Sequence, residues 1–219
     1  MSWRVERRAG TAGELHARAL DDVGRLVELL EVTGPAIVLG SRQARDEVDV
    51  AATGERGIEV VRRRSGGGGV LLLPGAQAWI DVTIGRDDPL WHDDVAVAFE
   101  WLGASWAAAM AGFGLTPVVH TGRLVDSAWS PRVCFAGLGP GEVTVGGRKL
   151  VGISQRRTRA GARFQCVVHR RWDPDALLGL LALDEGTRAA AGQALAGVAT
   201  GLDRPSEQVL EVLVAALPT

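Results

Sequence analysis

A run of four glycines, at residues 66–69, is the part of this 219-residue sequence that most strongly suggests chemistry. It follows Arg62, Arg63, Arg64 and Ser65, and we predict that it lies within a hairpin of two buried strands. Such glycines expose backbone N–H groups with no side chain in the way, and the resulting concavity can hold an anion. Three arginines at its entrance would supply charge for a phosphate or a carboxylate. The alternative is a flexible connection.

Lys149 is the only lysine among 24 lysine and arginine residues, and it follows Gly146, Gly147 and Arg148. The abundance of arginine, alanine, glycine, valine and leucine is typical of a GC-rich coding sequence, which replaces lysine by arginine. A lysine retained in such a sequence predicts a role for a compact, movable ammonium group that the rigid guanidinium fork cannot fill. The alternative is an ordinary solvated strand residue after a turn.

The cysteines and histidines show no metal-ligand pattern. Cys134 and Cys166 lie far apart, and neither has a second cysteine at C-x-x-C spacing. This usage predicts a reduced, cytosolic protein without structural zinc. We expect no metal site from the histidines either, because no ligand spacing relates His16, His92, His120 and His169.

The composition limits the class of protein. Apolar residues make up 47% of the chain, enough for one large core, so we expect a single domain over residues 1–219. The formal charge of -2 gives no reason to expect nucleic acid as a partner. No apolar run is long enough to cross a membrane, and none follows the N-terminal arginines as in a secretory signal. We therefore expect a cytoplasmic protein.

Apolar periodicity predicts the elements that must position these residues. The predicted helices cover residues 13–30, 46–53, 95–113 and 173–181. The first helix depends on a stripe formed by Leu15, Ala19, Val23, Leu26 and Leu30. A last helix is predicted with Asp203 as its N-cap and Pro205 in its first turn. The predicted strands cover residues 36–40, 58–62, 70–73, 78–84, 142–145, 148–155 and 163–168.

The predicted strands come as hairpins and do not alternate strictly with helices. This order predicts the α+β class with a mixed sheet, and it argues against a Rossmann sheet. Residues 122–141, which contain Cys134, are predicted to be a long loop before the lysine hairpin.

The glycine run and the lysine hairpin together resemble the lipoate–protein ligase and biotin–protein ligase superfamily. Its members show R-R-x-S-G-G-G after a strand and, later, a hairpin of the form G-R-K-x-x-G-x-A. The residues that match the first motif are Arg62, Arg63, Ser65, Gly66, Gly67 and Gly68, and Gly69 completes the run. The residues that match the second are Gly147, Arg148, Lys149 and Gly152, with Ser154 where alanine is usual.

The resemblance implies a central mixed β-sheet flanked by helices, as in class II synthetases and biotin–lipoate ligases, with no accessory C-terminal domain. It also implies a ligand bound over the glycine run and a Lys149 that contacts both the acyl carboxylate and the α-phosphate of an acyl-adenylate. The substrates would be ATP with Mg²⁺ and either lipoate or octanoate. The partners would be lipoyl carrier domains, those of the 2-oxoacid dehydrogenase E2 subunit or the H protein of glycine cleavage.

The sequence departs from the ligase pattern at two places. Leu72 and Leu73 stand where the family's ligases usually carry His-Asp. The later strand reads Gln165-Cys166-Val167 where a His-Gly pair is usual. These departures concern the activity and leave the expected fold unchanged.

Cys134 and Phe135 indicate a second function. A related branch of the superfamily, the cysteine-dependent octanoyltransferases, carries Cys-Phe just before the lysine hairpin. Its cysteine forms an acyl thioester and passes the acyl group between carrier lysines without ATP. A thiolate is a competent acyl carrier, and Arg132 and Lys149 could stabilise it here. The alternative is an inert cysteine that lines the substrate site.

We therefore expect, first, an ATP-dependent lipoate– or octanoate–protein ligase. The second expectation is an acyltransferase that uses Cys134 and needs no ATP. The third is a member of the family that binds a ligand or a protein partner without turnover.

Overall fold

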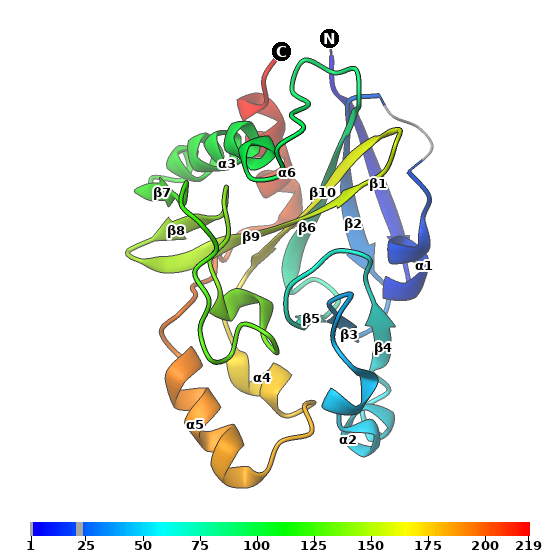
Figure 1. Ribbon diagram of the computed structural model, residues 1–219, viewed down its shortest axis with the longest axis vertical. Coiled ribbons are helices and arrows are strands. Elements are labelled where there is room, and N and C mark those ends of the chain that lie inside the picture. The colour runs from blue at the N-terminus through cyan, green and yellow to red at the C-terminus, as the bar shows by residue number, and fades with distance from the viewer. Residues whose placement is uncertain (1, 21–23) are drawn as a thin grey trace.

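The computed structural model describes residues 2–20 and 24–219 of the chain. Its main element is a seven-stranded sheet in the order β1-β2-β6-β10-β9-β8-β7 (Figure 1). Neighbouring strands are antiparallel except β1 and β2, which run parallel. The strands are β1 (Arg4–Gly10), β2 (Leu26–Val32), β6 (Gln77–Gly85), β7 (Pro117–Val119), β8 (Val143–Val145), β9 (Arg148–Arg157) and β10 (Gly161–His169).

A smaller sheet carries the glycine run. β3 (Ala36–Leu39) lies in its centre, with β4 (Glu59–Arg62) parallel on one side and β5 (Val70–Leu72) antiparallel on the other. The glycines therefore join two strands that do not pair with each other, and the predicted hairpin is wrong. The physical reason is that β3, buried along its whole length, lies between these strands and pairs with both.

Helices cover the sheets at both ends of the molecule (Figure 1). α3 (Glu100–Gly112), which follows the 3-10 turn Val97–Phe99, packs with α6 (Ser206–Ala216) against the large sheet. The main core between them contains Ile80, Leu102, Trp106, Phe164 and Leu213. α4 (Pro174–Leu178) and α5 (Glu185–Leu195) join β3 in a second core. α1 (Ala12–Ala17) contacts β4, and α2 (Val50–Glu55) leads into it. No helix in the described part of the chain is long and apolar enough to cross a membrane.

Residues 13–30 do not form one helix, contrary to the prediction. α1 ends at Ala17, residues 26–32 form β2, and Val23 lies outside the described residues. Leu26 and Leu30 have helical spacing, but every residue from 26 to 30 is buried. A segment buried on both faces is a central strand. Here the burial of all five residues, Glu28 included, outweighs the four-residue spacing of the two leucines.

Most other predicted elements are confirmed with shifted ends, including the strands of the small sheet, the lysine hairpin and the long helix α3. The helix predicted over residues 46–53 is split into the 3-10 turn Arg45–Glu47 and α2. The helix predicted over residues 173–181 ends at Leu178. Asp203 is not an N-cap, because α6 begins at Ser206 after Pro205 and the Asp203 carboxylate binds Arg170. β1, β7 and α5 were not predicted.

Charged side chains are buried in the centre of the large sheet. Asp81 on β6 is fully buried, accepts a hydrogen bond from Trp79 Nε1 at 2.8 Å, and lies 3.8 Å from Arg163 Nε. Burial raises the pKa of Asp81 to about 7, against the opposing effect of the Arg163 charge. Burial alone would also raise the pKa of Glu28 on β2, but hydrogen bonds from Arg18 and Arg8 outweigh it and lower that pKa.

The Asp81→Asn variant is expected to gain stability relative to the wild type as the pH rises from about 4 to about 7. The folded protein holds the Asp81 proton up to about pH 7, whereas the unfolded chain releases it near its ordinary pKa of 3.8. Ionisation therefore costs the wild type stability within this window, and asparagine has no such cost. Chemical denaturation of both proteins across this range measures the effect, and titration of other groups cancels in the difference. A stability difference between the two proteins that does not change with pH would contradict a pKa of Asp81 raised by burial.

Candidate active site

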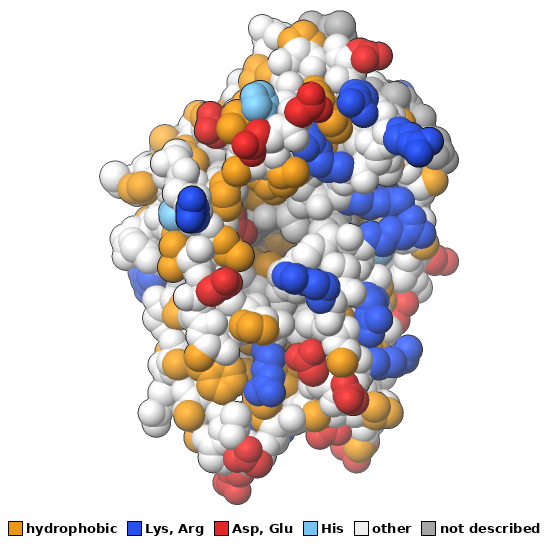
Figure 2. Space-filling model, in the orientation of Figure 1, with side chains coloured by type: hydrophobic (Ala, Val, Ile, Leu, Met, Phe, Trp, Pro, Cys, Tyr) orange, Lys and Arg blue, Asp and Glu red, His pale blue; other side chains and the backbone are white. Residues whose placement is uncertain are grey.

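A cleft of about 870 Å³ opens between the glycine run and the lysine hairpin. Figure 2 shows this face of the molecule hollowed near its middle, with arginines on the side that carries the small sheet. Gly66, Gly67 and Gly68 line one wall, and Lys149 and Ser154 on β9 line another. Cys134 lies between the two, in the 3-10 turn Cys134–Ala136.

Close backbone approach fixes the second half of the glycine run. Gly69 N–H donates to Arg132 O at 2.8 Å, and Cys134 N–H donates to Gly69 O at 3.0 Å. A Cβ on Gly68 would lie 2.5 Å from Val133 N, so this position tolerates only glycine. The run is therefore joined through its backbone to the segment that carries the cysteine.

Arg63 braces the first half of the run. Its side chain is buried, and its guanidinium donates to the carbonyl oxygens of Val38 at 3.2 Å, Gly66 at 2.7 Å and Gly68 at 2.9 Å. Gly67 has a φ of +93°, which suits glycine. Arg63 Nη1 and Nη2 thus donate to the protein backbone, and the contact with a bound anion predicted for this residue stays a prediction.

Lys149 is buried and hydrogen-bonded through its whole ammonium group. Its Nζ lies 2.7 Å from Glu142 Oε2 and donates to Gly137 O at 2.9 Å and to Cys134 O at 3.1 Å. Glu142 is also buried, and it accepts hydrogen bonds from the backbone N–H groups of Gly139 and Ile153. The pairing of Glu142 with Lys149 was not predicted. The acidic residue at the start of a predicted strand of the hairpin is the sequence signal that could have pointed to it.

The main chain of Lys149 is held as well. Its N–H donates to Val198 O at 2.9 Å, and its carbonyl accepts from Thr200 N–H at 2.9 Å. The segment after α5 thereby forms an isolated parallel bridge with β9, and this bridge tethers the lysine to the C-terminal part of the chain.

Cys134 stands where the cleft meets a narrow apolar pocket of about 40 Å³. The pocket runs between the two sheets and is lined by Val38, Leu72, Trp79, Phe135 and Val167, among others. The guanidinium beside the thiol is that of Arg63, whose Nη2 lies 3.8 Å from Sγ, whereas Arg132 is exposed. A positive charge at this place interacts favourably with a thiolate.

A chain of polar side chains crosses one wall of the pocket. Ser65 Oγ lies 3.1 Å from Ser154 Oγ and donates to Gln165 Oε1 at 3.0 Å. Gln165 Nε2 in turn donates to His16 Nδ1 at 3.2 Å. Burial lowers the pKa of His16 to about 3, helped by the charges of Arg63 and Arg163, so its ring is a neutral acceptor at pH 7. Sequence reasoning missed His16, which has no local motif and lies 149 residues from Gln165.

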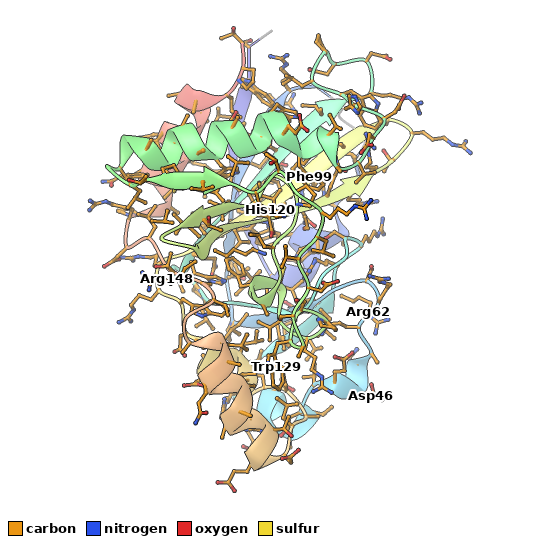
Figure 3. All side chains as sticks on the ribbon, turned by 60° about the vertical axis from the view of Figure 1, so that its left-hand side comes forward. Asp46, Arg62, Phe99, His120, Trp129 and Arg148 are labelled. Carbon is orange, nitrogen blue, oxygen red and sulfur yellow. The ribbon has the colours of Figure 1, made fainter. Side chains whose placement is uncertain are left out.

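The structure does not bring every predicted residue to the cleft. Gly147 has a φ of +72° and forms the hairpin turn together with Gly146, and Arg148 is exposed beside it. Arg62 is exposed on β4, and Figure 3 shows Arg62 and Arg148 on opposite sides of the molecule. Gly152 lies in the pocket wall, where a Cβ would come within 3.1 Å of the Phe135 ring. Among the described residues there is no cluster of three or more His, Cys, Asp and Glu side chains that could hold a metal ion.

The cleft itself has more acidic than basic side chains in its lining. The basic ones are Arg42 and Lys149. The acidic ones are Glu47, Asp126 and Glu142. Glu142 pairs with Lys149. The lining then has one further positive side chain, Arg42, and two further negative ones, Glu47 and Asp126.

Residues 14–210 match the family of the lipoyl protein ligase A/B catalytic domain, and the chain belongs to this family. The resemblance stated from the two sequence motifs is thereby confirmed. Among curated proteins, the octanoyltransferase LipM of Moorella thermoacetica is 33% identical over 125 residues, which cover 56% of this chain and 45% of that protein. The match thus spans less than half of the relative's length.

Solved structures share the fold. A bipartite lipoate protein ligase from Thermoplasma acidophilum, described with its E2 lipoyl domain, has a TM-score of 0.76 at 17% identity, covering 99% of this chain and 82% of that one. A lipoate-protein ligase A bound with ATP has a TM-score of 0.69 at 16% identity, covering 99% and 84%. The predicted α+β fold with a mixed sheet flanked by helices is confirmed.

Replacing Gly67 by alanine is expected to destabilise the protein by about 1–3 kcal/mol, because alanine is strained at this φ and its Cβ would crowd Arg63. Gly66→Ala is the matched control, since a Cβ at Gly66 meets no atom within 4 Å. Chemical denaturation of both variants tests the difference. Equal stability of the two would mean that the backbone at Gly67 is not constrained.

Replacing Lys149 by methionine is expected to cost about 3–5 kcal/mol of stability, because Glu142 is left buried without a counter-charge. Lys149→Arg should not keep the wild-type stability, because the larger planar guanidinium does not fit the buried space that the ammonium fills between Glu142 Oε2 and the carbonyl oxygens of Cys134 and Gly137. Adding Glu142→Gln to Lys149→Met should recover most of that stability, because no charge is then left buried. Denaturation curves of the wild type and the three variants measure the differences. Equal stability of Lys149→Met and the double variant would contradict the charge argument.

Proposed function

We propose that this protein transfers an octanoyl or lipoyl group through Cys134 to a lysine of a lipoyl carrier domain, without ATP. The observation that supports this function best is the position of the thiol. Cys134 borders both the apolar pocket, which suits an acyl chain, and the open cleft, through which a carrier lysine can approach. The transferase is therefore preferred here to the ligase, whereas the sequence alone favoured the ligase.

The chemistry needs two steps. The Cys134 thiolate attacks the carbonyl of an acyl thioester, a C–S bond to the enzyme forms, and the donor thiol leaves as its own C–S bond breaks. The amine of the carrier lysine then attacks the enzyme thioester and forms an amide. The Cys134 thiolate is released, and the amine loses its proton to solvent. The Arg63 guanidinium lies beside the sulfur, and Lys149 Nζ donates a hydrogen bond to the carbonyl oxygen of Cys134.

The charge of the cleft argues against ATP as a substrate. Triphosphates are bound by basic side chains and by metal ions that offset their negative charge. Here the lining has two basic and three acidic side chains, and Arg63 is occupied by backbone carbonyls. Leu72, in place of the histidine of the ligase pattern, is buried and lines the apolar pocket.

The relative at 33% identity is named an octanoyltransferase, which agrees with this reading. One structural neighbour is described with an E2 lipoyl domain, and this supports a lipoyl domain as the acceptor here. A second candidate function is the ATP-dependent ligase. The size of the cleft favours it, since about 870 Å³ beside the glycine run is more than an acyl chain fills.

One experiment with two arms separates these functions. In the first arm, the protein receives an octanoyl thioester and a lipoyl carrier domain without nucleotide. In the second arm, it receives octanoate or lipoate, the carrier domain and Mg-ATP. We expect transfer in the first arm and an octanoyl mass on the peptide that contains Cys134. The Cys134→Ala variant should lose both.

Cys166→Ala is the matched control. Cys166 lies in the main core, fully buried, and burial raises the pKa of its thiol, so it should not react. Transfer that requires Mg-ATP, releases pyrophosphate and survives Cys134→Ala would replace the proposal by the ligase. Ligand binding without transfer in either arm would leave a binding protein.

A further inference from the structure

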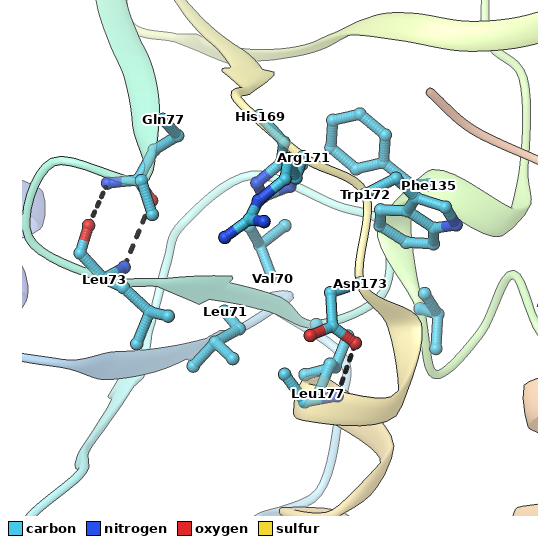
Figure 4. A pocket seen from close by; sticks show the side chains of 14 residues that line it. Val70, Leu71, Leu73, Gln77, Phe135, His169, Arg171, Trp172, Asp173 and Leu177 are labelled. Atoms are coloured by element: carbon cyan, nitrogen blue, oxygen red, sulfur yellow. Dashed lines mark hydrogen bonds between the residues drawn. The ribbon is translucent and has the colours of Figure 1, made fainter. Parts of the chain in front are cut away.

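A second apolar pocket lies on the far side of Phe135 from the apolar pocket that Cys134 borders. It has a volume of about 80 Å³ and is bounded by β5, the end of β10 and the helix α4 (Figure 4). Its apolar walls are formed by Leu71, Trp172, Ala176 and Leu177. We call it the distal pocket. Nothing in the proposed chemistry at Cys134 uses it.

The ring of Phe135 separates the two pockets. Phe135 and Val70 line both, so each pocket ends where the other begins. The ring is buried, with its centroid 4.7 Å from that of His169 and 5.5 Å from that of Trp172. Gly152 provides the space for the ring, because a Cβ there would lie 3.1 Å from it.

The apolar pocket alone is too short for an octanoyl chain. Its volume of about 40 Å³ holds roughly three groups of the size of water, at about 10–15 Å³ each. The distal pocket adds room for roughly six more by the same measure. A methylene group is of comparable size, so the seven carbons beyond the carbonyl of an octanoyl group need both pockets.

The distal pocket is suited to an uncharged chain end. Its polar wall includes the half-buried His169, and desolvation lowers the pKa of this histidine to about 4, helped by the charge of Lys149. The ring is therefore neutral at pH 7. Arg171 and Asp173 also line the pocket, and both of these charged residues are exposed to solvent.

We propose that the distal pocket is a second acyl subsite, which receives the tail of the chain when the Phe135 ring turns aside. Chains of about four carbons end at the ring, and longer chains pass it. Phe135 thus determines chain length, and the distal pocket supplies the affinity for medium-length chains. This inference rests on the proposed transfer through Cys134, whose thioester would start the chain at the mouth of the apolar pocket.

Filling the distal pocket tests the inference. Ala176 lies on α4 and is partly exposed, so Ala176→Phe can place a ring in the pocket without disturbing a core. The measurement is kcat/KM for thioesters from butanoyl to dodecanoyl. Each methylene buried contributes roughly fourfold. We therefore expect the ratio of octanoyl to butanoyl kcat/KM to fall at least about tenfold in Ala176→Phe. Ala104→Phe, at an exposed position of α3, should leave the ratio unchanged.

The Phe135→Ala variant should increase the preference for longer acyl chains. Removing the ring joins the two pockets, so the ratio of dodecanoyl to octanoyl kcat/KM should rise on the order of tenfold. Calorimetric binding of octanoate and butanoate to the same proteins provides a readout that needs no turnover. Octanoate binding weakened by Ala176→Phe would support the subsite even if no transfer occurred and the proposed function failed. An unchanged chain-length series and unchanged octanoate binding in Ala176→Phe would overturn the inference.

Discussion

The buried ion pair between Lys149 and Glu142 is the interaction on which the rest of the site depends. Removing two charges from water is costly, and an isolated pair seldom repays that cost. Here each member also binds the backbone: Lys149 holds the carbonyls of Cys134 and Gly137, and Glu142 accepts the N–H of Ile153. One pair therefore fixes both the cysteine loop and the neighbouring strand β9. The ammonium group of Lys149 is compact enough to contact all three acceptors, Glu142 Oε2 and the two carbonyl oxygens, at once.

Arg63 performs the same task on the other side of the thiol. Its guanidinium holds the carbonyls of Gly66 and Gly68, while the backbone of Gly69 is bonded to the segment that ends at Cys134. Two buried cations thus brace two loops through main-chain oxygens. The sulfur is positioned by backbone geometry, and its apolar neighbours are free to form a pocket.

The sequence predicted the parts of the site that have unusual residue types. The glycine run, Lys149 and Cys134 all reach one cleft, as their motifs implied. The sequence could not indicate that Arg63 braces the glycine run. Arg63 is one of three adjacent arginines, and its side chain is buried only because β3 lies next to β4. The contact between His16 and Gln165 joins distant segments and has no local pattern. The helix predicted over residues 13–30 failed because a buried strand and a helical stripe share apolar spacing when the run is short.

The bridge between Lys149 and the segment after α5 has a consequence for the order of folding. The backbone partners of the lysine are Val198 and Thr200, some fifty residues further along the chain. Contacts of high sequence separation form after local ones, because the intervening loop must first be closed. During synthesis the hairpin of β8 and β9 can pair early, but the lysine gains its last main-chain partners only when the segment after α5 has emerged. A nascent chain that stops before residue 198 contains Cys134 and the glycine run, yet its lysine lacks the backbone tether of the finished protein.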